Sequence, residues 1–181
     1  GSEDGSQWTS MRPLDYPGVL AELVAELPHD QPLRSAKIHT SADGTLVIDT
    51  FEFGDVAPCD LNDPPQAAKL EEMIAYAATA MPEWSPEDIR DYCTRCAADY
   101  VLTITPLRMT KHWKMFQAIT NTDSTDLMLE PEGDPTRCRI SVAVANSTRR
   151  VMLERIAERL SHANINIHRA HLDTVSDGAN G

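Results

Sequence analysis

The sequence predicts an α+β protein that contains a duplicated supersecondary unit. An apolar helix pattern occurs at residues 19–27 and again at residues 152–160. A strand pattern follows each helix, at residues 35–40 and 169–174, with about one residue of slip between the copies. An Asp-Gly turn closes both copies. Duplicated small units usually pair to build a shared core, so a helix and a strand near each end are expected to belong to sheet-and-helix structure.

The N-terminal third predicts a strand, a helix and a two-stranded hairpin. Asp15-Tyr16-Pro17-Gly18 is a turn signal immediately before a stretch whose apolar residues recur at helical spacing. Alternating and β-branched residues then predict two strands around the turn at Ala42-Asp43-Gly44. The expected elements are a strand over 8–13, a helix over 19–27, and strands over 34–41 and 46–53.

Three helices are predicted in the middle of the chain, each with its own capping signal. Asp63, Ser85 and Thr105 each precede a proline, which is favoured in the first turn of a helix. The expected helices start at these caps, and the first and third end near Met81 and Ile119. Residues 100–105 fit a strand or part of a helix by composition, and both readings stay open.

The C-terminal part predicts a hairpin followed by the second copy of the unit. Residues 127–129 and 139–145 flank a Gly-Asp-Pro turn, with Ile140, Val142 and Val144 expected on a buried face. A helix to about His162 and a strand over 164–175 follow. The first copy continues past its turn into another strand and the second does not, so we expect the chain to be a fragment of a longer protein.

Composition limits the class of protein. The chain has 181 residues with 41% hydrophobic and 24% charged residues, which is typical of globular domains. Its net charge of −12 argues against a nucleic-acid partner, because phosphate backbones require clustered Lys and Arg. No apolar run approaches the roughly 20 residues of a membrane span. Four cysteines are typical of a reducing compartment, so we expect a cytoplasmic location, with the mitochondrial matrix as the alternative.

Signals for catalysis and for metal binding are weak. Cys93 and Cys96 have the spacing of half a zinc site, but a structural zinc needs about four ligands and no second pair occurs. Two small residues on the core face of a helix are the simpler interpretation. The chain has no glycine-rich phosphate loop and no nucleophile elbow. We therefore expect no metal, no cofactor and no catalytic residue in this chain.

The first copy resembles an ACT domain, a small ligand-binding module of amino-acid and nitrogen metabolism. The resemblance rests on Asp15-Tyr16-Pro17-Gly18-Val19-Leu20, on residues 35–44 and on residues 47–53. It implies a ferredoxin-like βαββαβ fold for two modules, the second incomplete. The implied domains are a disordered N-terminus at 1–7, a first module at 8–81, a helical insert at 82–125 and a truncated second module at 126–181.

The resemblance also implies a site for an amino-acid effector at the first turn. Gly18 would let the backbone approach a ligand, and the free N–H groups of the helix that follows favour a carboxylate. The implied ligand-binding residues are Asp15, Tyr16, Pro17, Gly18, Val19 and Leu20, with Ser147 and Thr148 in the second copy. The second copy has no Asp or Gly in its turn. Modules of this family pair, which implies a homo-oligomer.

The order of the parts resembles the N-terminal regulatory part of a large NAD-dependent glutamate dehydrogenase. In that case a downstream domain would use NAD to deaminate glutamate to 2-oxoglutarate. A nitrogen-sensing uridylyltransferase fits the order less well. An oligomerisation module that binds nothing and a catalytic ferredoxin-like domain both stay open as functions of the chain.

Overall fold

A computed structural model describes residues 7–12, 17–43, 45–119, 125–145 and 149–176. Six helices and six strands form within these ranges, so the predicted α+β class is confirmed. The chain divides into two compact units. We call residues 1–56 with 148–174 the sheet unit, and residues 57–147 with 175–181 the helical unit. No helix in the described ranges is long and apolar enough to cross a lipid bilayer.

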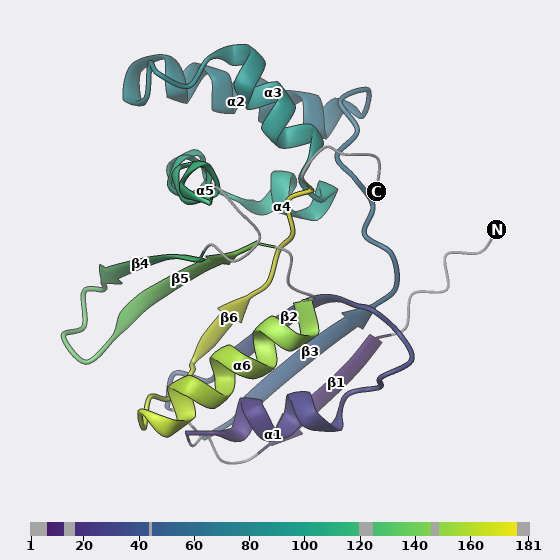
Figure 1. Ribbon diagram of the computed structural model, residues 1–181, viewed down its shortest axis with the longest axis vertical. Helices are drawn as coiled ribbons and strands as arrows, with labels where there is room; N and C mark the ends of the chain where they lie inside the picture. Colours follow the sequence, from purple (N-terminus) through teal and green to yellow (C-terminus); the bar gives the residue numbers. More distant parts are fainter. Residues whose placement is uncertain (1–6, 13–16, 44, 120–124, 146–148, 177–181) are drawn as a thin grey trace. The chain divides into compact units, whose positions relative to one another are not determined.

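The sheet unit contains elements from both ends of the sequence. They are β1 (Gln7–Arg12), α1 (Val19–Glu26), β2 (Leu33–Thr40), β3 (Val47–Phe53), α6 (Arg149–His162) and β6 (Arg169–His171). The strands form one sheet in the order β1-β3-β2-β6, and each neighbouring pair is antiparallel (Figure 1). Along the chain these elements follow the order βαββαβ.

Alternation along β3 defines the core of the sheet unit. Val47, Asp49, Phe51 and Phe53 are buried, and the residues between them are half-buried. This is the two-residue period of a strand with one face against a core. The apolar cluster on this face joins α1, α6 and the sheet, through Leu20, Val24, Leu27, Ala36, Ile38, Val47, Phe51, Phe53, Leu153, Ala157 and Leu172.

The two copies of the repeat lie within this single unit. Helices α1 and α6 lie side by side, and β2 pairs directly with β6 through Lys37–His171, Ile38–Ala170 and His39–Arg169 (Figure 1). The arrangement differs from separate modules at 8–81 and 126–181. A helix–strand unit has an apolar face that its own copy can cover. The intervening residues can form an insert, because the entropy cost of closing a loop rises slowly with its length.

The helical unit contains the middle of the chain. Its elements are α2 (Pro64–Ala80), α3 (Pro86–Thr94), α4 (Ala98–Thr103), α5 (Pro106–Ala118), β4 (Thr125–Pro131) and β5 (Cys138–Val144). The three predicted caps are confirmed: Asp63, Ser85 and Thr105 each accept a hydrogen bond from a backbone N–H three residues on. Of the segment over 100–105 that fitted either a strand or a helix, residues 100–103 are helical in α4, and Ile104 and Thr105 are extended.

Aromatic side chains fill the core of the helical unit. Trp84 stacks on Trp113 with 4.7 Å between ring centroids, and its edge meets Tyr92 at 5.7 Å. Cys93 and Cys96 are buried in the same cluster, and Cys93 Sγ lies 3.9 Å from Met109 Sδ. Burial raises the pKa of Cys93 to about 12, so its thiol stays protonated at neutral pH. Both cysteines therefore act as small core residues.

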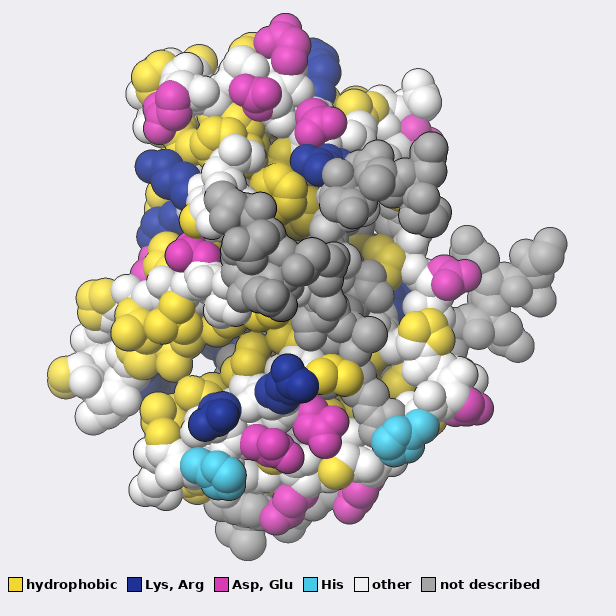
Figure 2. All heavy atoms as spheres, viewed as in Figure 1, with side chains coloured by type: hydrophobic (Ala, Val, Ile, Leu, Met, Phe, Trp, Pro, Cys, Tyr) yellow, Lys and Arg dark blue, Asp and Glu magenta, His cyan; other side chains and the backbone are white. Residues whose placement is uncertain are grey.

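The hairpin of β4 and β5 corrects one prediction. Its register places Leu127 opposite Val142 and Leu129 opposite Ile140, so these four residues share one face. Leu127 is 58% exposed and Leu129 is 62% exposed. Figure 2 shows hydrophobic side chains gathered over the hairpin. Ile140, Val142 and Val144, which we expected on a buried face, are only half-buried, because a two-stranded hairpin cannot cover its own face.

The final predicted strand is much shorter in the structure. We expected a strand over 164–175, whereas β6 contains only Arg169–His171. Asn164 has a positive φ of 57°, and Ile165 N–H donates to Leu160 O at the end of α6. The segment after α6 therefore remains part of the helix C-terminus before the chain becomes extended.

Candidate functional site

The predicted turn before α1 contains a glycine with a left-handed backbone. Gly18 is the N-cap residue, with φ 98° and ψ −10°, and its carbonyl accepts the N–H of Glu22 at 3.0 Å. Residues with a Cβ rarely adopt this conformation. The turn also approaches α6 closely, since a Cβ built on Gly18 would lie 2.7 Å from Ser161 Oγ. Glycine thus serves both the turn and the helix contact.

A small crevice lies beside this turn. Its lining residues are Gly18, Val19, Leu20, Ala21, Ala157, Ile165, Asn166 and Ile167, which belong to the sheet unit. The open space holds about one water molecule. Backbone N–H groups in the first turn of a helix have no partner within the helix and attract anions. The crevice therefore combines a helix N-terminus, the Asn166 amide and apolar walls.

The predicted site residues have different outcomes. Pro17 and Gly18 form the turn, and Val19 and Leu20 are buried, so they contribute backbone to the crevice and side chains to the core. Asp15, Tyr16, Ser147 and Thr148 lie outside the described residues. The wall formed by residues 165–167 was not predicted, because it comes from the other end of the chain.

Gly18→Ala is expected to destabilise the sheet unit by about 1–3 kcal/mol, because alanine would be strained at this φ and its Cβ would crowd Ser161. Chemical denaturation followed by circular dichroism measures the loss. In a Ser161→Ala background, where the close Oγ is absent, the same substitution should destabilise the sheet unit less.

Gly133 supplies the matched control for this prediction. It lies in the turn of the β4–β5 hairpin, and a Cβ there would meet nothing within 4 Å. Gly133→Ala should leave stability nearly unchanged. Equal losses for the two alanine variants would contradict the argument from backbone geometry.

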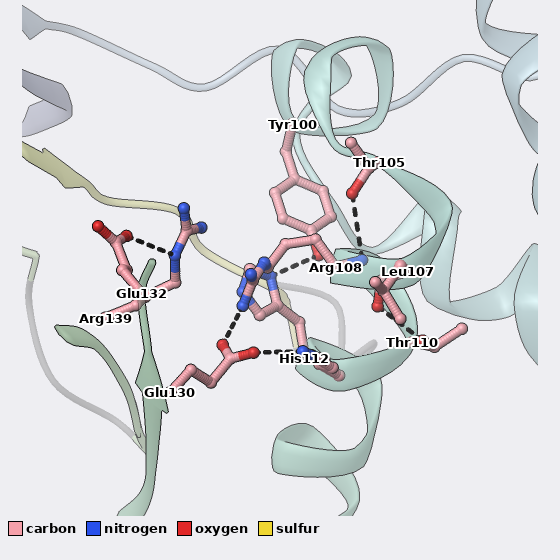
Figure 3. A network of polar contacts seen from close by, with 10 residues as sticks. Tyr100, Thr105, Leu107, Arg108, Thr110, His112, Glu130, Glu132 and Arg139 are labelled. Carbon is pink, nitrogen blue, oxygen red and sulfur yellow. Dashed lines mark hydrogen bonds and ion pairs between the residues drawn. The ribbon is translucent and has the colours of Figure 1, made fainter. Parts of the chain in front are cut away.

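A second polar cluster joins α5 to β4 in the helical unit. Glu130 accepts hydrogen bonds from Arg108 and Lys111, which lie one turn apart on α5. Figure 3 shows the contact between Glu130 and Arg108. These two bonds, led by the one from Lys111, lower the pKa of Glu130. Arg139 and Glu132 form a further ion pair at 3.9 Å. The cluster fixes the hairpin to the helix.

Two tyrosine hydroxyl groups and an imidazole form a row of polar contacts in the same unit. Tyr92 Oη lies 3.3 Å from Tyr100 Oη, which lies 3.0 Å from His112 Nδ1 (Figure 3 shows the second pair). Burial and the nearby Arg108 and Arg139 guanidinium groups lower the pKa of His112 to about 4. His112 is therefore neutral at pH 7, and its Nδ1 can accept the Tyr100 proton.

His112 should make stability depend on pH. Because its folded pKa of about 4 is below the ordinary 6.5, the unfolded chain binds a proton that the folded chain does not. Its contribution is complete above pH 6.5 and is lost as pH falls toward 4. The wild type should lose on the order of 1–3 kcal/mol more than His112→Asn over this interval. Denaturation at several pH values measures this difference, and parallel profiles would contradict it.

Asp49 is a buried carboxylate that sequence reasoning did not select. It is 1% exposed on the core face of β3, between Val47 and Phe51. Buried acids are uncommon and are often found at functional positions. The alternation of β3 contained the signal, because an acid occupies a position that the pattern assigns to the core.

Within the described ranges, no three His, Cys, Asp or Glu side chains are grouped as metal ligands. Comparison of the chain with models of protein families, with curated protein sequences and with solved structures found no match.

Proposed function

We propose that the sheet unit is an ACT-type regulatory module that binds an amino-acid effector in the crevice beside Gly18. In this proposal both copies of the repeat contribute to a single module, and the helical unit is an insert within it. The βαββαβ order of the elements and the glycine turn before α1 support the proposal. The resemblance of residues 15–20 to the family's signature supplies the class of ligand.

The observation that carries the proposal is the junction of the turn with the segment after α6. The first turn of α1 offers N–H groups suited to a carboxylate, and Ile165 and Ile167 offer apolar contact for a side chain. The space holds about one water molecule, so binding of an amino acid requires the segment over 165–167 to move outward. Such a movement would couple the effector to the conformation of the unit.

We propose as host a large enzyme of nitrogen metabolism, by preference an NAD-dependent glutamate dehydrogenase whose catalytic domain follows this region. The order of parts in the sequence supports this choice over a uridylyltransferase. NAD would belong to that catalytic domain. Paired modules of two subunits would transmit the effect of the ligand.

Calorimetric titration with glutamate, glutamine and the other amino acids tests the effector site. Ala21 lines the crevice in the first turn of α1, so Ala21→Glu places a carboxylate where the effector's carboxylate would bind. An acid in the first turn suits the helix dipole, so the helix should remain folded. Ala25→Glu, at an exposed position one turn later, is the matched control.

We expect at least one amino acid to bind the wild type and Ala25→Glu equally, and to bind Ala21→Glu roughly tenfold more weakly, the ratio that corresponds to a lost charge-assisted contact. If no amino acid gave a measurable heat of binding, the result would contradict the effector site. Equal binding to both variants would place the ligand elsewhere.

The contact between Gly18 and Ser161 favours one alternative function. Close packing of α1 on α6 explains the glycine without any ligand. The unit would then serve only subunit association. Stable dimers in sedimentation experiments, together with no heat from any amino acid, would favour this alternative.

A further inference from the structure

The face of the sheet opposite α1 and α6 carries a group of basic side chains. On β2, Lys37 and His39 alternate with the buried Ala36 and Ile38 and are exposed. On β6, Arg169 and His171 flank Ala170 and are also exposed. Because side chains alternate between the faces of a strand, these four residues share the open face.

The register sets these four side chains in a compact grid. Lys37 lies opposite His171, and His39 lies opposite Arg169. Side chains opposite each other are about 5 Å apart, and alternate side chains along a strand are about 7 Å apart. We call Lys37, His39, Arg169 and His171 the basic grid. Lys37 and Arg169 stand at diagonal positions of this grid, each opposite a histidine.

The strand positions beside Lys37 add no charge to the grid. On the open face of β3, Glu52 forms an ion pair with Arg34 of β2. Thr50 of β3 lies opposite Lys37, and Thr9 of β1 lies opposite Thr50, so neither neighbour brings a charge. Asp173 is exposed two residues beyond β6. The whole chain has a net charge of −12, so the basic grid is a patch of basic side chains on an acidic protein.

We propose that the basic grid docks an extended acidic polypeptide segment of a partner protein. Alternate side chains of an extended chain are about 7 Å apart, which matches the spacing of the grid along each strand. Charge complementarity of this kind sets orientation and speeds association. The proposal is independent of the effector site, which lies on the helix-covered side of the sheet.

A polypeptide fits the face better than a nucleic acid does. Sheets that bind single-stranded RNA use exposed aromatic side chains on which bases stack. Among the described residues of this open face, Ile48 and Thr50 lie on β3 and Thr9 lies on β1, and none of the three is aromatic. The acidic balance of the chain also opposes a phosphate backbone.

Fluorescence anisotropy of a labelled twelve-residue peptide with alternating Glu and Ser tests the proposal at low ionic strength. The test variant is Lys37→Glu with Arg169→Glu. The control is Arg155→Glu with Arg159→Glu, which makes the same change in net charge at exposed positions on α6. Lys37→Gln with Arg169→Gln provides a milder variant, and circular dichroism checks that each protein folds.

We expect the Lys37/Arg169 charge reversal to weaken peptide binding roughly tenfold, as the sum of two surface charge contacts. The glutamine pair should give a smaller loss in the same direction, and the α6 control should bind within about twofold of the wild type. Equal loss in the test and control variants would overturn the proposal. Preferential binding of a twelve-nucleotide RNA over the peptide would also overturn it.

Discussion

Replacing Trp84 by Ala is expected to lower the free energy of unfolding of the helical unit by about 3–5 kcal/mol. The side chain is 2% exposed, stacks on Trp113 and meets the edge of Tyr92. Its removal leaves a cavity among rings that cannot close together without losing their mutual contacts. Urea denaturation followed by far-ultraviolet circular dichroism measures the change without relying on the lost fluorophore.

Leu107→Ala is the control for this substitution. Leu107 lies on α5 in the same unit and is 51% exposed. Its replacement by Ala should lower the free energy of unfolding by less than about 1 kcal/mol. A Trp84 variant no less stable than the Leu107 variant would contradict the placement of the tryptophan at the centre of the core.

Replacing Phe51 by Ala is expected to lower the free energy of unfolding of the sheet unit by a similar amount, about 3–5 kcal/mol. Phe51 is fully buried on β3, a central strand, in the cluster that joins α1 and α6 to the sheet. Hydrogen exchange followed by mass spectrometry locates the effect. Faster exchange should appear in α1 and also in α6, although α6 lies far along the sequence.

Met11→Ala is the matched control in the sheet unit. Met11 lies on the neighbouring strand β1, on the opposite face, and is 66% exposed. Met11→Ala should change the hydrogen-exchange rates of α1 and α6 little. Protection of α6 that is unaffected by Phe51→Ala would mean that this helix does not share the core of the sheet.

Local chemistry made the helix starts predictable from sequence. Asp63, Ser85 and Thr105 each offer an oxygen to the first turn and precede a proline that suits it. These signals act within four residues, so they need no knowledge of the fold. The turn at Asp43 is similar: its carboxylate accepts bonds from Ser41 and Thr45, which lower its pKa to about 2.

Long-range pairing was not predictable in the same way. The repeat showed that two helix–strand units exist, but not whether each builds its own module or both share a sheet. That choice depends on the contact of β2 with β6, between residues 37–39 and 169–171. The exposed face of the hairpin at Leu127 and Leu129 was missed for the same reason, since alternation shows that a face is apolar and not what covers it.

The same difference between local and long-range signals applies to the candidate site. The Pro17-Gly18 turn was predictable, because a glycine before an apolar helix is a local signal. Ser161 and the wall over 165–167 were not, because α6 brings them to the turn from the second copy. The bond between Tyr100 and His112 depends likewise on how α4 and α5 approach each other.

The pairing of β2 with β6 supports both the single sheet unit and the crevice, and an engineered disulfide tests it most directly. His39→Cys with Arg169→Cys joins two residues that the register places opposite each other, in a Cys138→Ser background that removes the exposed native thiol. Opposed residues in a sheet lie within the Cα separation of about 4.4–6.8 Å that a disulfide spans. His39→Cys with His171→Cys is the diagonal control, at about 7–8 Å.

We predict that mild oxidation of the monomer forms the disulfide between residues 39 and 169 in high yield, and forms the diagonal one poorly. Peptide mapping by mass spectrometry without reduction identifies each bond. Free thiols at both positions after oxidation, or equal yields for the two pairs, would contradict a sheet that joins both ends of the chain.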